Sequence, residues 1–147
     1  MEEFGYVVIG AILTWLGTVL HGNYFSIRSQ SVNYIDDYLR DLGTIESLAV
    51  EYWSKNASAP EEKLLSARLR GALHSSSIFL EYSKNALGND HPRFTDLDGE
   101  MYDAATGGDF DGADRVESYE RIVRIATTAS ELRHLLRAAR MKTYWAR

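Results

Sequence analysis

The sequence predicts an all-α protein in which a single N-terminal transmembrane helix precedes an antiparallel bundle of three long helices and one short helix. Three observations lead to this fold class. Apolar residues recur with the 3.6-residue period of an α-helix over long segments. Only two prolines, Pro60 and Pro92, interrupt the chain. Finally, no Asp, Glu, Lys or Arg lies between Glu3 and Arg28.

The uncharged stretch, Phe4 to Ile27, is predicted to anchor the chain in a membrane. Its strongly apolar part, Phe4 to Leu20, has about the shortest length that crosses a bilayer core. Two alternatives are weaker. A cleaved signal peptide begins with a positive region, whereas this chain begins Met1-Glu2-Glu3. A buried core helix rarely runs this far without a charge. We therefore assign residues 1–28 to a transmembrane anchor and 29–147 to one helical domain.

The positive residues that flank the anchor predict its orientation. None precedes it, and Arg28 and Arg40 follow it. Positive residues favour the cytoplasmic side of a spanning helix. We expect a single-pass protein of the inner (plasma) membrane with the bulk of the chain in the cytoplasm.

Four residues of the anchor form a stripe on one side of the helix. At 100° per residue, Gly10, Thr14, Gly17 and His21 fall within about 60° of one another. Small residues let helix backbones approach closely in lipid, so this stripe predicts a homo-oligomer. The alternative is the ordinary composition of membrane helices, in which small residues are frequent.

The first helix of the domain is predicted from Ser29 or Ser31 to about Asn56. One face is apolar, and Glu46 projects from its centre, while Arg133 occupies a similar place in the last helix. A carboxylate in an apolar stripe needs a partner or access to water. We hypothesise that Glu46 and Arg133 form a buried pair that sets helix register. Alternatively, Glu46 extends to solvent.

The second helix is predicted from about Pro60 to Leu87. Ser58 is placed as its N-cap, and Gly88 ends it. The loop before it is short, so the first two helices should form an antiparallel hairpin.

Residues 88–112 form an acidic connection with one short helix. Thr95 is expected to cap that helix, which runs from Asp96 to Ala105 and ends at Gly107-Gly108. The acids do not follow the spacing of a calcium-binding loop, so we expect a solvated segment and no metal site.

The last helix is predicted from Ala113 or Asp114 to near the C-terminus. After Glu131 its charged residues are all basic. This tail has two interpretations that depend on charge placement alone. It contacts anionic lipid headgroups, or it balances the helix dipole and the acidic connection.

Composition excludes several classes of function. The chain has no cysteine, which excludes disulfides, thiolate chemistry and cysteine-ligated zinc. A net charge of −5 and a pI of about 5.3 argue against a nucleic-acid binder. Nucleotide-binding and hydrolase motifs are missing. We therefore expect no cofactor and no catalysis.

One short segment carries a resemblance to a known family. Arg68-Leu69-Arg70-Gly71-Ala72-Leu73-His74 resembles the Arg-and-His motif of HEPN ribonucleases, which are small all-α proteins. The layout of an N-terminal spanning helix and a helical domain is similar to that of the membrane-anchored, pore-forming HEPN-like accessory proteins of type VI CRISPR systems. The resemblance implies a ribonuclease site in which Arg68 or Arg70 acts with His74. The segment departs from the family at Leu69, where a polar residue usually follows the arginine.

Together these features predict a membrane-anchored, self-associating helical protein that acts as a scaffold, a regulator or a membrane-perturbing effector. The alternative is a membrane-tethered HEPN-like ribonuclease or an antiphage accessory protein. The expected partners are the membrane, further copies of the chain and an unidentified protein.

Overall fold

The computed structural model describes residues 2–58 and 60–145, with side chains described for 12–24, 26, 28–58 and 60–142. The chain folds into α1 (Glu2–Trp53), α2 (Glu62–Leu87), a 3-10 turn η1 (Gly88–Asp90), α3 (His91–Thr106) and α4 (Tyr119–Trp145). No strand occurs in the described part of the chain. The predicted all-α class, with three long helices and one short helix, is confirmed.

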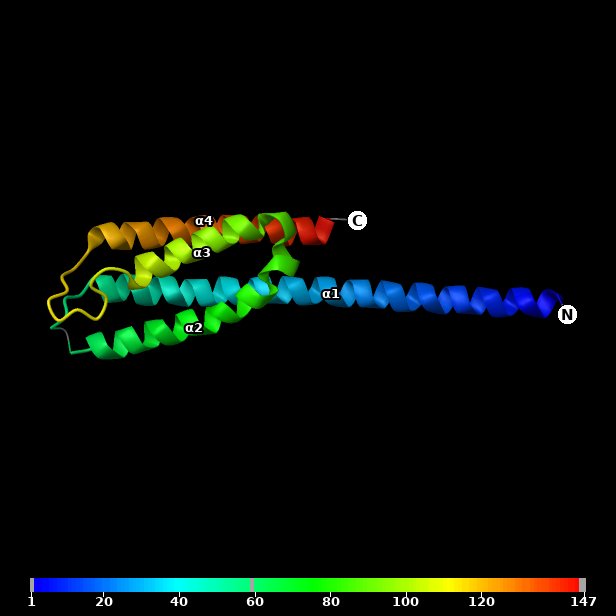
Figure 1. Ribbon diagram of the computed structural model, residues 1–147, viewed down its shortest axis with the longest axis horizontal. Helices are drawn as coiled ribbons and strands as arrows, with labels where there is room; N and C mark the ends of the chain where they lie inside the picture. Colours follow the sequence, from blue (N-terminus) through cyan, green and yellow to red (C-terminus); the bar gives the residue numbers. More distant parts are fainter. Residues whose placement is uncertain (1, 59, 146–147) are drawn as a thin grey trace.

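Helix α1 is the axis of the molecule (Figure 1). Its C-terminal half packs with the other three helices, and α2 and α4 run antiparallel to it. Its N-terminal half projects well beyond the bundle. The connections that follow α1 and α3 meet at the end of the bundle opposite this projection.

The predicted boundary at residue 28 is not a break in secondary structure. Helix α1 is 52 residues long and passes through residue 28 without interruption, because no proline breaks its backbone hydrogen bonds. The first buried residue along the described chain is Val32. What changes near residue 28 is therefore the packing of α1, since the other helices contact it only beyond this boundary.

The core lies where α1 meets the other helices. Apolar residues of α1 recur every three or four positions and point inward, as their helical period requires. Aromatic rings fill the centre: Tyr38 packs against Phe79 at 5.0 Å and Phe94 at 5.2 Å between ring centroids. The largest buried apolar side chains are Trp53, Tyr52, Phe94, Ile35, Leu42, Ile45, Leu69, Met101, Ile125, Leu132 and Leu136.

Two predicted helix ends are confirmed. Gly88 ends α2 with φ of 54°, a conformation that glycine adopts without strain, and its N–H donates to the Lys84 carbonyl. The N–H of Gly107 donates to the Asp103 carbonyl and ends α3.

The predicted helix starts are wrong in three places. Ser58 does not cap α2, because its hydroxyl donates to Asn56 and α2 begins only at Glu62. Thr95 lies inside α3, where its hydroxyl donates to the His91 carbonyl. Helix α3 begins at His91 because Pro92 favours the first helical turn. Finally, α4 begins at Tyr119 instead of Ala113 or Asp114.

Candidate functional site

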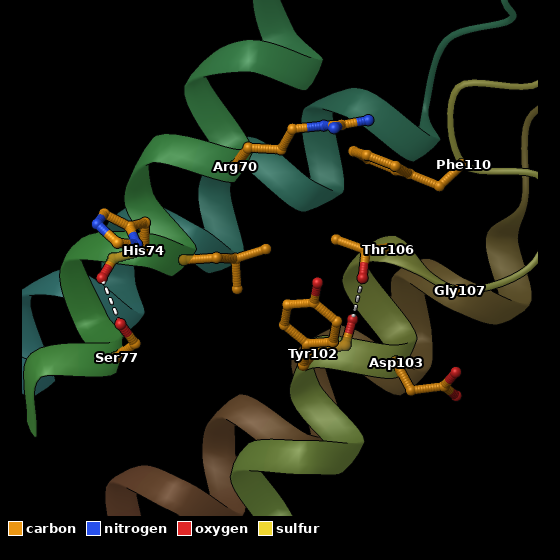
Figure 2. A pocket seen from close by; sticks show the side chains of 9 residues that line it. Arg70, His74, Ser77, Tyr102, Asp103, Thr106, Gly107 and Phe110 are labelled. Atoms are coloured by element: carbon orange, nitrogen blue, oxygen red, sulfur yellow. Dashed lines mark hydrogen bonds between the residues drawn. The ribbon is translucent and has the colours of Figure 1, made fainter. Parts of the chain in front are cut away.

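A groove of about 590 Å³ separates α2 from the C-terminal end of α3 (Figure 2). Its walls combine basic, aromatic and hydroxyl-bearing side chains over an apolar floor. The lining residues are Arg70, Leu73, His74, Ser77, Tyr102, Asp103, Thr106, Gly107 and Phe110.

Arg70 and His74 stand one helical turn apart on α2 and line the same groove. The Arg70 guanidinium lies over the Phe110 ring, 5.4 Å from its centroid, and contacts the Asp111 carboxylate. The connection after α3 therefore holds Arg70 at the mouth of the groove. His74 is exposed, and its carbonyl accepts a bond of 2.7 Å from Ser77.

The opposite wall belongs to α3. Tyr102 is 59% exposed and faces the groove, and Thr106 donates to the Tyr102 carbonyl at 2.9 Å. The Asp103 carboxylate points away from Arg70 and His74 (Figure 2) and accepts a bond of 2.8 Å from Arg124 on α4. The described side chains of this groove thus present one imidazole, one guanidinium and several hydroxyls.

Arg68, the other arginine of the predicted motif, is exposed on α2 and does not line the groove. Its position follows from helix geometry, since residues 68 and 74 lie about 120° apart around the axis. The structure brings Arg70, and not Arg68, together with His74.

Metal binding has no support in the part of the chain that the structure describes. Its His, Asp and Glu side chains form no group of three or more that could hold a metal ion.

The end of the bundle is built around a buried cation that sequence reasoning missed. Arg115 is 2% exposed, and its guanidinium lies 4.0 Å from the centroid of the Tyr52 ring. One of its nitrogens donates to the carbonyls of Tyr52, at 3.0 Å, and Lys55. The Glu62 carboxylate lies 3.8 Å from the other terminal nitrogen.

Tyr52 links this cation to the wall of the groove. Its hydroxyl donates to Glu62 at 3.1 Å and accepts the backbone N–H of Asp111 at 2.9 Å. Burial raises the pKa of the Tyr52 phenol, and the nearby Arg115 acts in the opposite direction. Asp111 in turn accepts bonds from Ser66, at 2.5 Å, and Arg70. The groove residue Arg70 is therefore connected to the buried Arg115 through hydrogen bonds.

A second buried polar contact joins α1 to α3. The Tyr38 hydroxyl donates to Asp98 at 2.5 Å. Burial is the main cause that raises the pKa of both side chains, while the Tyr38 bond acts to lower that of Asp98.

Glu46 and Arg133, the proposed pair between α1 and α4, are in contact. An Arg133 nitrogen donates to the Glu46 carboxylate. Their side chains remain 24% and 28% exposed, so the pair is half-buried instead of fully buried as proposed.

The basic C-terminal segment of α4 contacts acids within the bundle. Lys142 pairs with Asp90 of η1 at 2.7 Å, and Arg140 pairs with Asp36 of α1 at 3.0 Å. These contacts agree with attraction to acidic segments of the chain, one of the two interpretations of the basic tail.

The residues of the predicted N-terminal stripe lie on the projecting half of α1. Thr14, Gly17 and His21 are exposed, and a Cβ on Gly17 would meet no atom within 4 Å. Gly10 lies outside the residues whose surroundings the structure describes.

The same half of α1 exposes large apolar side chains. Leu13, Trp15 and Leu20 are each about 65% exposed. The full set is Ile12, Leu13, Trp15, Leu16, Val19, Leu20 and Tyr24.

Within the described residues, no helix combines the length and apolar character needed to cross a membrane. The described residues therefore give no support to the predicted transmembrane anchor. Described side chains begin at Ile12, so the first third of the predicted segment, residues 4–11, lies outside them.

Comparison of the chain with protein-family models, with curated proteins and with solved structures finds no match.

Proposed function

We propose that this protein is a membrane-attached, self-associating helical scaffold. The observation that carries the proposal is the projecting half of α1. It leaves the bundle and exposes a group of apolar side chains that no other described element covers. Exposed apolar groups of this size mark surfaces that bind lipid or protein.

Lipid fits this surface better than a single partner helix. At 100° per residue, the exposed apolar residues from Ile12 to Tyr24 spread over about half of the helix circumference. One packed helix covers a narrower stripe. The rest of the circumference carries Thr14, Gly17 and His21.

The sequence before Ile12 supports the same proposal. Residues Phe4 to Ala11 include no charge and extend the apolar segment toward the N-terminus. The first positive residue is Arg28, close to the point where packing begins at Val32. With Arg28 and Arg40 on the cytoplasmic side, the bundle and its groove lie in the cytoplasm.

Membrane attachment is tested by flotation of the full chain with liposomes of neutral and anionic lipid. We expect the wild-type protein to float and a Leu13→Lys/Leu16→Lys variant to remain at the bottom of the gradient. A Leu64→Lys/Ile78→Lys variant is the matched control, because it places the same charges on an exposed face of the bundle. Equal flotation of all three proteins would exclude attachment through α1.

Self-association is assigned to the stripe of Gly10, Thr14, Gly17 and His21. The test is the mass of the detergent-solubilised full chain by light scattering, compared with a Gly10→Leu/Gly17→Leu variant. Gly22→Leu serves as the control, because Gly22 is exposed on a different side of the helix and a Cβ there meets nothing within 4 Å. A discrete oligomer that only the stripe variant dissociates supports the proposal. A monomeric mass for all three proteins would exclude self-association.

The second candidate function is a membrane-tethered HEPN-like ribonuclease or antiphage accessory protein. One observation favours it: Arg70 and His74 line one groove, where an imidazole can transfer protons and a guanidinium can hold a phosphate. We expect Arg70→Ala and His74→Ala to abolish cleavage of single-stranded RNA by the pure protein, and Arg68→Ala to leave it unchanged. RNA that remains intact with the wild-type chain excludes the ribonuclease.

A further inference from the structure

The two ends of the bundle differ in charge. At one end, named here the proximal end, α1 leaves the bundle beside the last turn of α2, η1 and the C-terminal segment of α4 (Figure 1). Arg28, Gly88 and Lys142 line one cleft at this end. At the opposite end, named here the distal end, lie the connections 54–58 and 107–118. The proximal end is therefore the part of the bundle nearest to the exposed apolar residues of α1.

The distal end is acidic and far from the proximal end. Its exposed carboxylates are those of Glu61, Asp109, Asp114, Glu117 and Glu120. The packed part of α1, residues 32–53, is about 33 Å long, which separates the two ends by roughly four Debye lengths at physiological salt. The distal carboxylates therefore act only weakly on a charged surface that contacts the proximal end.

The acids of the proximal end are paired within the bundle. Asp90 of η1 accepts a bond from Lys142 at 2.7 Å, and the Asp36 carboxylate of α1 lies 3.0 Å from an Arg140 nitrogen. Each pair joins one carboxylate to one base, so it adds no net charge to this end. The charge of the proximal end is therefore set by its remaining basic residues.

Those remaining residues include Lys84 and Arg93. Lys84 lies in the last turn of α2 and Arg93 in the first turn of α3, and both are exposed. Neither forms an ion pair with a described side chain. The nearest acids along the same two helices, Glu81 and Asp96, lie three residues nearer the distal end, about 4.5 Å along the axis. The outermost charges of the proximal end that lack an acidic partner are therefore positive.

A cation and an aromatic ring also meet where α1 leaves the bundle. The Arg28 guanidinium lies 4.9 Å from the centroid of the ring of Tyr24, a residue that is 53% exposed. The sequence of the last turn of α4 ends with Tyr144 and Trp145. Tyrosine and tryptophan beside basic residues are typical of the level at which a bilayer meets water. Charge and aromatic content thus indicate the same kind of surface.

We propose that the proximal end binds the headgroups of anionic phospholipids and holds the bundle upright on the membrane. This inference rests on the proposed attachment of α1 to lipid and names the lipid that the bundle itself contacts. The basic residues after the apolar segment assign the bundle to the cytoplasmic side, where the leaflet carries anionic lipid. A bilayer also covers the apolar side chains of α1 next to this end, which a soluble anion would leave exposed.

Vesicle binding of the full chain tests the proposal. The two membranes are phosphatidylcholine alone and an equal mixture of phosphatidylcholine and phosphatidylglycerol. One basic residue near an anionic surface contributes a gain in binding of roughly fivefold. We expect Lys84→Gln/Arg93→Gln to bind the mixed vesicles at least about tenfold more weakly than the wild type, with unchanged binding to phosphatidylcholine. Lys63→Gln/Arg68→Gln is the matched control, because it removes the same charge from exposed positions of α2 nearer the distal end.

A fluorescent label reports the orientation, because the natural chain contains no cysteine. The label is attached to Asn89→Cys at the proximal end or to Ala113→Cys at the distal end, both of which are exposed and uncharged positions. Lipid with a nitroxide on its headgroup quenches a label only at short range. In mixed vesicles we expect strong quenching of the label at residue 89 and little quenching at residue 113. Equal quenching at both positions would overturn the proposal.

The two membranes also separate failure of this inference from failure of the proposed function. Binding to phosphatidylcholine that does not increase with phosphatidylglycerol, or an equal loss in the two charge variants, would overturn the inference and leave the attachment of α1 intact. Failure of the chain to bind either membrane would overturn the attachment of α1 itself, and the inference with it. A gain with phosphatidylglycerol that disappears at about 1 M salt, where the Debye length is about 3 Å, would support binding through charge.

Discussion

The Arg115 guanidinium lies against the Tyr52 ring at 4.0 Å and donates to the Tyr52 carbonyl at 3.0 Å. One arginine thus bonds to carbonyls at the end of α1 that are otherwise shielded from water, and it covers the Tyr52 ring of the core. Backbone bonds join the same segments, since Ala57 donates to the Arg115 carbonyl and Ser118 donates to the Trp53 carbonyl. These contacts hold together the end of the bundle, and Tyr52 connects that end to the groove through Asp111 and Arg70.

Replacing Arg115 should destabilise the fold strongly. Arg115→Leu leaves buried carbonyls without donors and should lower the free energy of unfolding by about 2–4 kcal/mol. Arg115→Lys should recover only part of this loss, because an ammonium cannot reproduce the planar stacking and the paired donors. Urea unfolding followed by circular dichroism measures both. Arg93→Ala, at an exposed position of α3, should change stability by less than about 0.5 kcal/mol. A loss of stability below about 0.5 kcal/mol in Arg115→Leu would contradict the structural role of Arg115.

The contact between Glu46 and Arg133 should contribute modestly. Both side chains are about a quarter exposed, so a double-mutant cycle with alanine should give a coupling of about 0.5–1 kcal/mol. The i, i+4 pair Glu51 and Lys55 at the end of α1, 3.0 Å apart and more exposed, is the control, with about 0.3–0.5 kcal/mol. Strictly additive losses for Glu46 and Arg133 would show that the contact does not stabilise the fold.

The Tyr38–Asp98 contact should make stability depend on pH. Burial raises the pKa of Asp98, so the folded state binds this proton more tightly than the unfolded state. The resulting stabilisation is complete below the unfolded pKa, about 3.9, and is lost as pH rises through the higher folded value. Relative to Asp98→Asn, the wild-type protein should therefore lose stability as pH rises from about 3.9 through the folded-state pKa of Asp98.

The measurement for this prediction is urea unfolding of the two proteins across that pH range. Asp96→Asn is the control, because Asp96 is exposed on the same helix. A difference between wild type and Asp98→Asn that stays constant with pH would contradict the prediction.

Removal of residues 1–28 should leave the bundle folded. Burial along α1 begins at Val32, so the deletion takes no described core residue. We expect a helical protein whose unfolding midpoint in urea matches that of the full chain in detergent and which no longer floats with liposomes. Circular dichroism and gel filtration measure the outcome. An unfolded deletion product would mean that the projecting half of α1 contributes to the core.

Local patterns in the sequence determined the helical class and most of the core. The period of apolar residues places Ile35, Leu42 and Trp53 on one side of α1, and all three are buried. Gly88 and Gly107 end their helices as predicted, because a C-terminal cap depends on the backbone of a few neighbouring residues. The same period placed Glu46 and Arg133 on facing sides of two helices that the structure packs together.

Tertiary structure decided the features that depend on residues distant in sequence. The start of α4 moves to Tyr119 because Arg115 is drawn under the end of α1, and no local pattern marks that contact across sixty residues. Arg70 and His74 are neighbours through the geometry of α2 alone, but the groove that they line exists because α3 lies beside α2. The sequence by itself thus determined the helical class and which sides of the helices are apolar, since both follow from a period of 3.6 residues. Only the packed structure decided which polar side chains meet, because those contacts depend on how the helices are arranged in space.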